Sequence, residues 1–185
     1  VFPDDLFVQD PLAAVIEDKT IRLKEGERRT VSILFADLKG FTGMSEKLDP
    51  ELIQTVMDKI MTIFTKSIED HGGYIDKYSG DEIMALFGAR VASETDTERA
   101  IRAGLQMLEY LKHFNTYIAN NKEFAHIDTS LEVRIGINTG LVTTGKIGKG
   151  REGDFTVYGD AVNLASRLES HAPVGSILVP VTIEK

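Results

Sequence analysis

Apolar residues recur along the chain with two different periods, which predict strands and helices. The run 30–38, TVSILFADL, is rich in β-branched and aromatic residues and predicts a buried strand. A helical period then predicts an amphipathic helix that begins at Asp49 and Pro50 and is stopped by Gly72 and Gly73. The residues expected on its buried face are Leu52, Ile53, Val56, Met57, Ile60, Phe64 and Ile68.

A β-hairpin and a second helix are expected next. The stretch 72–88, GGYIDKYSGDEIMALFG, predicts two strands joined by a tight turn at SGD, since Ser, Gly and Asp are common turn residues. The second helix is predicted to begin at TDTE, where Thr95 and Glu98 have capping-box spacing. The residues expected on one face of it are Ile101, Leu105, Leu108 and Leu111.

The last third of the chain returns to strand patterns. Segment 130–140 alternates as a strand should, with Leu131, Val133, Ile135 and Ile137 on one side. The Gly-rich segment 145–159 predicts a long hairpin or loop, 160–170 a third helix and 175–181 a final strand. The order βαββαβ, with further elements appended, predicts an α+β fold of the ferredoxin-like, split βαβ type. Its sheet should be mixed, mostly antiparallel and covered by helices.

Length and charge narrow the class of protein. The 185 residues favour one domain, expected over 30–185 and preceded by a lead-in over 1–29 that contains the charged run RLKEGERR. A net charge of −8 argues against a nucleic-acid surface. No apolar run reaches membrane-spanning length, so we expect no membrane contact. The chain has no cysteine, which fits a cytoplasmic protein, and no initiator Met, which predicts a fragment of a longer one.

Asp37 is the first candidate for chemistry. It ends the first predicted strand, and the turn that follows contains Gly40, Phe41 and Thr42. Backbone N–H groups in such a turn can hold phosphate oxygens. Taken singly, Asp37 is explained more simply as a cap of that turn.

Asp81 is the second candidate for chemistry. Taken singly, it too is explained more simply as an ordinary turn residue, but the pair of Asp37 and Asp81 is more informative. In a split βαβ sheet the first strand is central and is flanked by one hairpin strand, so Asp37 and Asp81 should meet at one sheet edge. Two close carboxylates raise each other's pKa unless a cation lies between them. Oxygen ligands of this kind suit Mg²⁺ or Mn²⁺ with bound phosphates. We expect Glu82 to lie on the other face as a solvated charge.

Four segments, SILFADLKGFT, DKYSGDEIMALFG, LEVRIGINTG and VYGDAVNLASRLES, together resemble the catalytic domains of class III nucleotidyl cyclases. The resemblance runs from about residue 30 to 180, with the segments in the family's order. It implies two Mg²⁺ or Mn²⁺ ions per site, held by Asp37, Asp81 and the carbonyl of Leu38. It further implies an in-line attack of the ribose 3′-hydroxyl of ATP on the α-phosphate, which yields cyclic AMP and pyrophosphate.

The same resemblance assigns the substrate contacts. Lys77 matches the adenine-reading lysine of adenylate cyclases, where guanylate cyclases usually have Glu. Thr156 matches a second base-reading position that is Asp in many members; Thr resembles the class IIIb subgroup, which responds to bicarbonate or CO₂. A Thr hydroxyl can accept from the adenine amino group or donate elsewhere, so it discriminates purines less sharply than a carboxylate. Arg134 matches an arginine that contacts the triphosphate. Asn163 and Arg167 match the pair that orients the ribose and stabilises the transition state.

In the family the site lies between two catalytic domains. One supplies the metal ligands and Arg134, and the other supplies Lys77, Thr156, Asn163 and Arg167, so the resemblance implies a homodimer with two shared sites. A further triphosphate-binding lysine of the family is expected beyond Lys185, which predicts that the domain is truncated at its C-terminus. The protein is then expected to be the adenylate cyclase output domain of a larger signalling protein. The alternatives are a guanylate cyclase and a non-catalytic, nucleotide-binding regulatory domain that dimerises.

Overall fold

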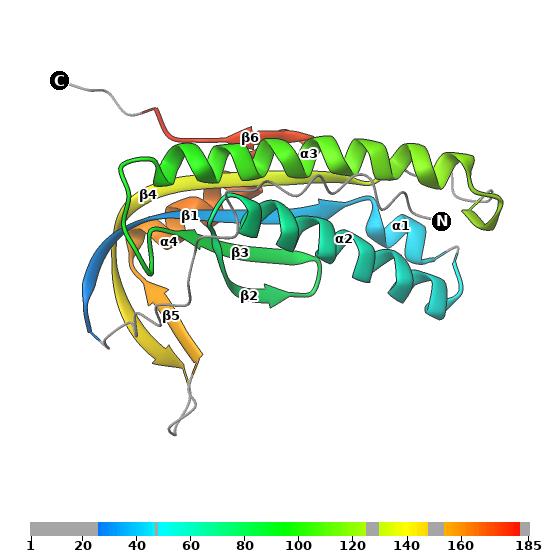
Figure 1. Ribbon diagram of the computed structural model, residues 1–185. Helices are drawn as coiled ribbons and strands as arrows, with labels where there is room; N and C mark the ends of the chain where they lie inside the picture. The colour runs from blue at the N-terminus through cyan, green and yellow to red at the C-terminus, as the bar shows by residue number, and fades with distance from the viewer. Residues whose placement is uncertain (1–25, 47, 125–129, 148–153, 182–185) are drawn as a thin grey trace.

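The protein folds around one twisted six-stranded sheet with helices on both faces (Figure 1). The computed structural model describes residues 26–46, 48–124, 130–147 and 154–181. The strand order is β2-β3-β1-β4-β5, and β6 also pairs with β4. All pairings are antiparallel except the parallel pair β4–β6, which confirms the α+β class with a mostly antiparallel sheet. The strands are β1 (Arg28–Lys39), β2 (Tyr74–Ser79), β3 (Glu82–Phe87), β4 (Glu132–Ile147), β5 (Asp154–Tyr158) and β6 (Ser176–Leu178).

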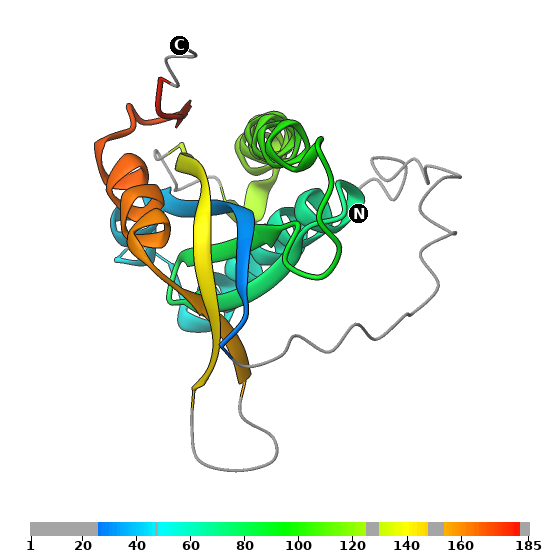
Figure 2. The same ribbon diagram turned by 90° about the vertical axis from the view of Figure 1, so that its left-hand side faces the viewer.

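The helices are divided unequally between the two faces. Figure 2 shows α2 and α3 on one side of the sheet and α4 on the other. The helices are α1 (Phe41–Ser45), α2 (Pro50–Asp70), α3 (Asp96–Asn120), the 3₁₀ helix η3 (Lys122–Phe124) and α4 (Asp160–His171). Among the described helices, none combines the length and apolar character that crossing a bilayer requires.

The central part of β1 is covered on both faces, which explains its mostly apolar sequence. Leu34 and Ala36 belong to the larger core beneath α2 and α3, whereas Ile33 and Phe35 belong to the smaller core on the face of α4. Side chains of a strand alternate between faces, so a strand covered on both faces has apolar residues at successive positions. β1 is therefore the central strand between β3 and β4 that the split βαβ order predicts.

Asp49 and Thr95 are the N-cap residues of α2 and α3, as predicted. Neither side chain makes a capping hydrogen bond, so the capping box expected from Thr95 and Glu98 is wrong. The first residue of α3 instead holds the preceding turn, because Oδ2 of Asp96 accepts a 2.8 Å hydrogen bond from the backbone N–H of Ser93.

The predicted buried face of α3 is also partly wrong. Leu105 is 55% exposed, and the buried positions are Ala100, Ala103, Gly104, Met107, Leu111, Phe114 and Ile118. Gly104 shows why, since a Cβ built on it would lie 2.9 Å from Cδ1 of Ile177 in β6. The small residues thus form the face on which α3 approaches the sheet.

The fourth strand is longer than predicted. β4 continues to Ile147, past the expected end at residue 140, and pairs antiparallel with β5, as the predicted long hairpin requires; residues 148–153 lie outside the described part of the chain. The last strand is shorter than expected, covering only Ser176–Leu178. The lead-in prediction falls almost wholly on residues 1–25, and Lys185 is likewise outside the described part of the chain.

Candidate active site

Asp37 and Asp81 lie on adjoining backbone at one end of the sheet. The β2–β3 turn consists of Gly80 and Asp81, and Gly80 has a φ of +64°, a left-handed conformation that glycine adopts without strain. The backbone N–H of Leu38 donates a 3.2 Å hydrogen bond to the carbonyl of Asp81. This contact ties the end of β1 to the turn, as the sequence predicts. Asp37, Leu38, Asp81 and Arg134 are called the carboxylate edge below.

Arg134 connects the carboxylate edge to α4. Asp37 lies opposite Arg134 of β4, and the two are joined by a 3.4 Å contact between Nη2 and Oδ2. Asp37 also forms an ion pair with Lys39. The other side of the Arg134 guanidinium faces α4, where Nε lies 3.3 Å from Oε1 of Glu169 and Nη1 donates to the carbonyl of Ser170 over 3.1 Å. Arg134 thereby holds α4 against the sheet.

Two further carboxyl groups make this edge acidic. Glu82 is half-buried and lies opposite Asp37 in the ladder, on the same face, so the prediction of a solvated charge on the other face is wrong. Burial and the charges of Glu169, Asp37 and Asp81 raise the pKa of Glu82, against the lowering effect of Lys77. Burial and the charge of Asp37 raise the pKa of Glu169. Negative charge is therefore in excess where β1, β3 and α4 meet.

The turn after β1 is a sharp one. Gly40 has a φ of +87°, and its carbonyl accepts a 3.2 Å hydrogen bond from the N–H of Met44. Phe41 begins α1 and packs against the larger core. The backbone of Thr42 lies within α1, while its side chain lies outside the described part of the structure.

Thr156 contacts the residue before Lys77, although β2 and β5 lie at opposite ends of the strand order. Lys77 is exposed on β2 opposite Met84, and Thr156, on β5, is 5% exposed. β4 and β5 bend away from the rest of the sheet (Figure 1), and Oγ1 of Thr156 donates a 2.6 Å hydrogen bond to Oδ2 of Asp76, the residue before Lys77. Sequence reasoning missed Asp76, because no local pattern predicts this bend.

Asn163 and Arg167 are exposed, one turn apart on α4. The opposite side of α4 packs on the sheet through Ala165 and Glu169, the two buried residues of the helix. This packing is very close at Gly136 of β4, where an added Cβ would lie 2.5 Å from the carbonyl oxygen of Ala165 and would collide with the backbone N of Glu169. The glycine thus fixes the position of α4 and, with it, the two exposed side chains.

The candidate residues form two groups in the described part of the chain. Within it, no hydrogen bond or ion pair joins the carboxylate edge to the second group, which is Lys77, Thr156, Asn163 and Arg167. The described residues also contain no cluster of three or more His, Cys, Asp or Glu side chains suited to a metal. Any metal held by Asp37 and Asp81 therefore needs backbone, water or substrate oxygens to complete its coordination.

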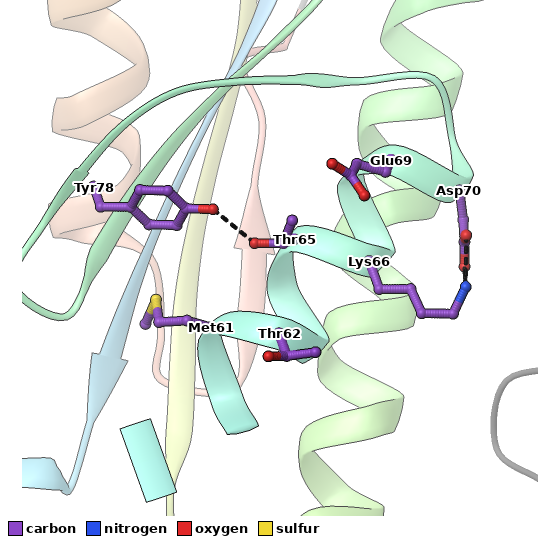
Figure 3. Close-up of a pocket in the computed structure, with 7 residues that line it drawn as sticks. All are labelled: Met61, Thr62, Thr65, Lys66, Glu69, Asp70 and Tyr78. Atoms are coloured by element: carbon purple, nitrogen blue, oxygen red, sulfur yellow. Dashed lines mark hydrogen bonds and ion pairs between the residues drawn. The ribbon is translucent and has the colours of Figure 1, made fainter. Parts of the chain in front are cut away.

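A pocket of about 410 Å³ lies on the helix-covered side of β2 (Figure 3). Tyr78 follows Lys77 along the strand and so points to the opposite face, where it makes a 2.8 Å hydrogen bond with Thr65 of α2. The other residues that line the pocket are Met61, Thr62, Lys66, Glu69 and Asp70. This pocket contains none of the predicted site residues.

Residues 23–185 match a known family, described as the adenylate and guanylate cyclase catalytic domain. The chain belongs to this family. An adenylate cyclase of Anabaena cylindrica is 36% identical over 169 residues, which are 88% of this chain and 32% of that protein. The chain therefore spans about a third of the length of this cyclase relative.

Solved cyclase structures agree with the fold. The adenylyl cyclase CyaB of P. aeruginosa has a TM-score of 0.77 at 34% identity, with 84% of this chain and 79% of that chain covered. The guanylyl cyclase Cya2 has a TM-score of 0.75 at 37% identity, with 84% and 77% covered. Both purine specificities thus occur among cyclases similar to this chain.

Proposed function

We propose that this domain is an adenylate cyclase that converts ATP into 3′,5′-cyclic AMP and pyrophosphate, as the output domain of a larger signalling protein. The 3′-oxygen of the ribose forms a bond to the α-phosphorus, the bond from that phosphorus to the pyrophosphate oxygen breaks, and the hydroxyl proton passes to water. The observation that carries this proposal is the carboxylate edge, where Leu38 bonds to Asp81 over 3.2 Å and Arg134 lies 3.4 Å from Asp37.

Two Mg²⁺ or Mn²⁺ ions fit the carboxylate edge. Asp37, Asp81 and the carbonyl of Leu38 offer the hard oxygen ligands that these ions prefer. Glu82 lies opposite Asp37 and follows Asp81 along the chain, and a cation relieves the repulsion among such carboxylates. When bound, the ions supply charge that lowers the pKa of the 3′-hydroxyl and neutralises the triphosphate.

The chain's own side chains hold and orient the nucleotide. Arg134 offers its guanidinium to the triphosphate, and the backbone N–H groups of residues 40–42 are the proposed phosphate contacts beside it. Lys77 donates to N1 of adenine and Thr156 contacts the 6-amino group. On α4, Asn163 orients the ribose, and Arg167 places a fixed positive charge where negative charge grows on the α-phosphate.

A homodimer supplies complete sites. Lys77, Asn163 and Arg167 are exposed and have no direct bond to the carboxylate edge, so a second copy can bring its carboxylate edge to them. Large apolar side chains are exposed on the same elements, since Leu164 follows Asn163 on α4 and is 39% exposed, and Leu141 of β4 and Tyr158 of β5 are 56% and 48% exposed. Aromatic residues are enriched in protein interfaces. A two-fold arrangement then forms two equivalent sites.

The deciding experiment incubates the full-length protein with ATP or GTP and Mg²⁺ or Mn²⁺, and separates the products. We expect cyclic AMP, and we expect it to disappear in Asp37→Ala and Asp81→Ala while Asp58→Ala, an exposed aspartate on α2, keeps the activity. Predominant cyclic GMP would establish a guanylate cyclase instead. Nucleotide binding without either product would establish a non-catalytic regulatory domain.

Thr156 motivates a second test, of stimulation by inorganic carbon. We propose that bicarbonate or CO₂ raises the cyclase rate, as the resemblance to class IIIb implies. Bicarbonate is added at constant pH and ionic strength, with chloride as the control anion. An equal rate in both salts contradicts the proposal.

A further inference from the structure

The hydroxyl of Thr156 has a fixed partner on the other edge of the sheet. Its Oγ1 donates to Oδ2 of Asp76 over 2.6 Å. Thr156 is 5% exposed and Asp76 is half-buried, so bulk water competes little for this contact. Hydrogen bonds to an ionised carboxylate in such surroundings are stronger than those between neutral groups.

A β-bulge places Asp76 for this role. The register of β2 with β3 passes from Ile75 opposite Ala85 to Lys77 opposite Met84, so Asp76 is the extra residue between them. A bulge re-aims a side chain without ending the strand. Asp76 can therefore reach β5 while Lys77, its direct neighbour, keeps its place in the ladder.

The bond to Asp76 determines what Thr156 can do for a ligand. A hydroxyl has one hydrogen and two lone pairs, and an ionised carboxylate can only accept. The single hydrogen of Thr156 therefore points at Asp76, and the two groups cannot exchange roles. What Oγ1 still offers is its capacity to accept a hydrogen bond.

Adenine and guanine carry different groups at position 6, and a hydrogen-bond acceptor distinguishes between them. Adenine presents an amino group, which donates, and guanine a carbonyl oxygen, which accepts. An acceptor at Thr156 pairs with the amino group but sets lone pair against lone pair with the guanine oxygen. Lys77 adds a group that can only donate, which suits the bare N1 of adenine and not the protonated N1 of guanine.

We propose that Asp76 is a positioning residue that sets the preference for ATP over GTP by holding the Thr156 hydroxyl as an obligate acceptor. The inference rests on the proposed cyclase function and adds to it a residue that touches neither nucleotide nor metal. It also resolves the ambiguity of a threonine at this position, because a free hydroxyl could serve either purine.

The test is the ratio of kcat/KM for ATP to kcat/KM for GTP in full-length Asp76→Asn. Asparagine has the same shape, but its amide can donate to Oγ1, which frees the Thr156 hydrogen for the guanine oxygen. We expect the ratio to fall about tenfold, the effect of one exchanged hydrogen bond in a buried site. A merely structural role lowers both values together and leaves the ratio unchanged.

Two further variants support the interpretation. In a Thr156→Val background, Asp76→Asn should no longer change the ratio, because the hydroxyl through which Asp76 acts is gone. Asp58→Asn, on the exposed side of α2, should keep the wild-type ratio. If Asp76→Asn does not fold, Asp76→Ser offers a smaller group that also donates or accepts, with the same expected fall.

The outcomes separate this inference from the proposed function. Wild-type protein that forms neither cyclic nucleotide refutes the cyclase proposal itself. Wild-type protein that forms cyclic AMP, together with an unchanged or increased ratio in the folded Asp76 variant, refutes the role of Asp76 alone.

Discussion

Arg134 is shared between two carboxylates of unequal burial. Its Nη2 lies 3.4 Å from Oδ2 of Asp37, and its Nε lies 3.3 Å from Oε1 of Glu169, whose side chain is only 4% exposed. A buried ionised carboxylate needs this guanidinium more than a solvated one does. When Glu169 takes up a proton, Arg134 is left to Asp37 and to any bound phosphate. Protonation of Glu169 therefore leaves more of the positive charge of Arg134 for the other groups at the carboxylate edge.

Glu169 also predicts how stability depends on pH. Burial, and then the charge of Asp37, raise its pKa in the folded state above the ordinary value of 4.5. Between 4.5 and the raised value, the folded protein binds more protons than the unfolded chain does. The free energy of unfolding should therefore fall as pH rises through this window, and Glu169→Gln should reduce that fall.

Urea unfolding of the wild type and Glu169→Gln, at several pH values from about 4 to 7 and with a chelator present, measures this difference. Glu94→Gln is the matched control, because Glu94 is an exposed glutamate in the turn before α3. Equal pH slopes for the wild type and Glu169→Gln would contradict the prediction.

At the scale of elements, the contact between α4 and β4 determines where the proposed catalytic side chains lie. Gly136 has no room for a side chain, since an added Cβ would lie 2.5 Å from the Ala165 carbonyl oxygen. Backbone atoms cannot move aside as a flexible side chain can. Because Asn163 and Arg167 extend from the other side of the same helix, a shift of α4 moves both.

Gly136→Ala should therefore destabilise the domain by about 1–3 kcal/mol, the usual cost of overpacking, and should lower kcat as α4 is displaced. Thermal unfolding and the rate of cyclic AMP formation measure the two effects. Gly43→Ala is the matched control, because nothing lies within 4 Å of a Cβ at this helical position and alanine favours helix. A Gly136→Ala protein as stable and active as Gly43→Ala would show that α4 is not held at this point.

Elements were predictable from the sequence where their signals are local. The β-branched and aromatic run of β1 predicted a buried strand, and the turn at Ser79-Gly80-Asp81 predicted the hairpin. The meeting of Asp37 and Asp81 followed from the order of the strands. These features depend on neighbouring residues and on general rules of topology.

Features that depend on tertiary packing were not predictable in this way. The bond between Thr156 and Asp76 joins residues 80 positions apart and needs the bend of β4 and β5. The buried face of α3 excludes Leu105 because small residues such as Gly104 approach β6. Periodicity predicts a helix, but it does not determine which of two adjacent helix faces packs on the sheet.

At the scale of the whole molecule, the exposed apolar residues next to Asn163 predict how copies associate. Leu164→Glu places a charge in the proposed interface and should shift the protein toward monomer, with loss of activity because each site needs two chains. Leu105→Glu is the matched control, since Leu105 is an exposed leucine on α3, beneath the opposite face of the sheet. Sedimentation velocity over a range of concentrations measures association. Equal association of both variants would place the interface elsewhere.

Complementation tests whether the sites are shared. Asp37→Ala removes a carboxylate and Asn163→Ala a ribose contact, so each homodimer should be inactive. In a heterodimer, one site combines the intact carboxylate edge of one chain with the intact Asn163 of the other, and the second site carries both defects. Random pairing makes about half of the dimers mixed, each with one intact site, so co-expression should restore about a quarter of the wild-type rate.

Two different affinity tags, used in succession, isolate the mixed dimers for the measurement. The purified heterodimer should then reach about half of the wild-type rate, because one of its two sites is intact. Co-expression of Asp37→Ala with Asp81→Ala is the control: both changes fall in the carboxylate edge, so every site in the mixed dimer lacks one metal ligand and activity should stay absent. Inactive heterodimers of Asp37→Ala and Asn163→Ala would mean that both groups serve a site within one chain.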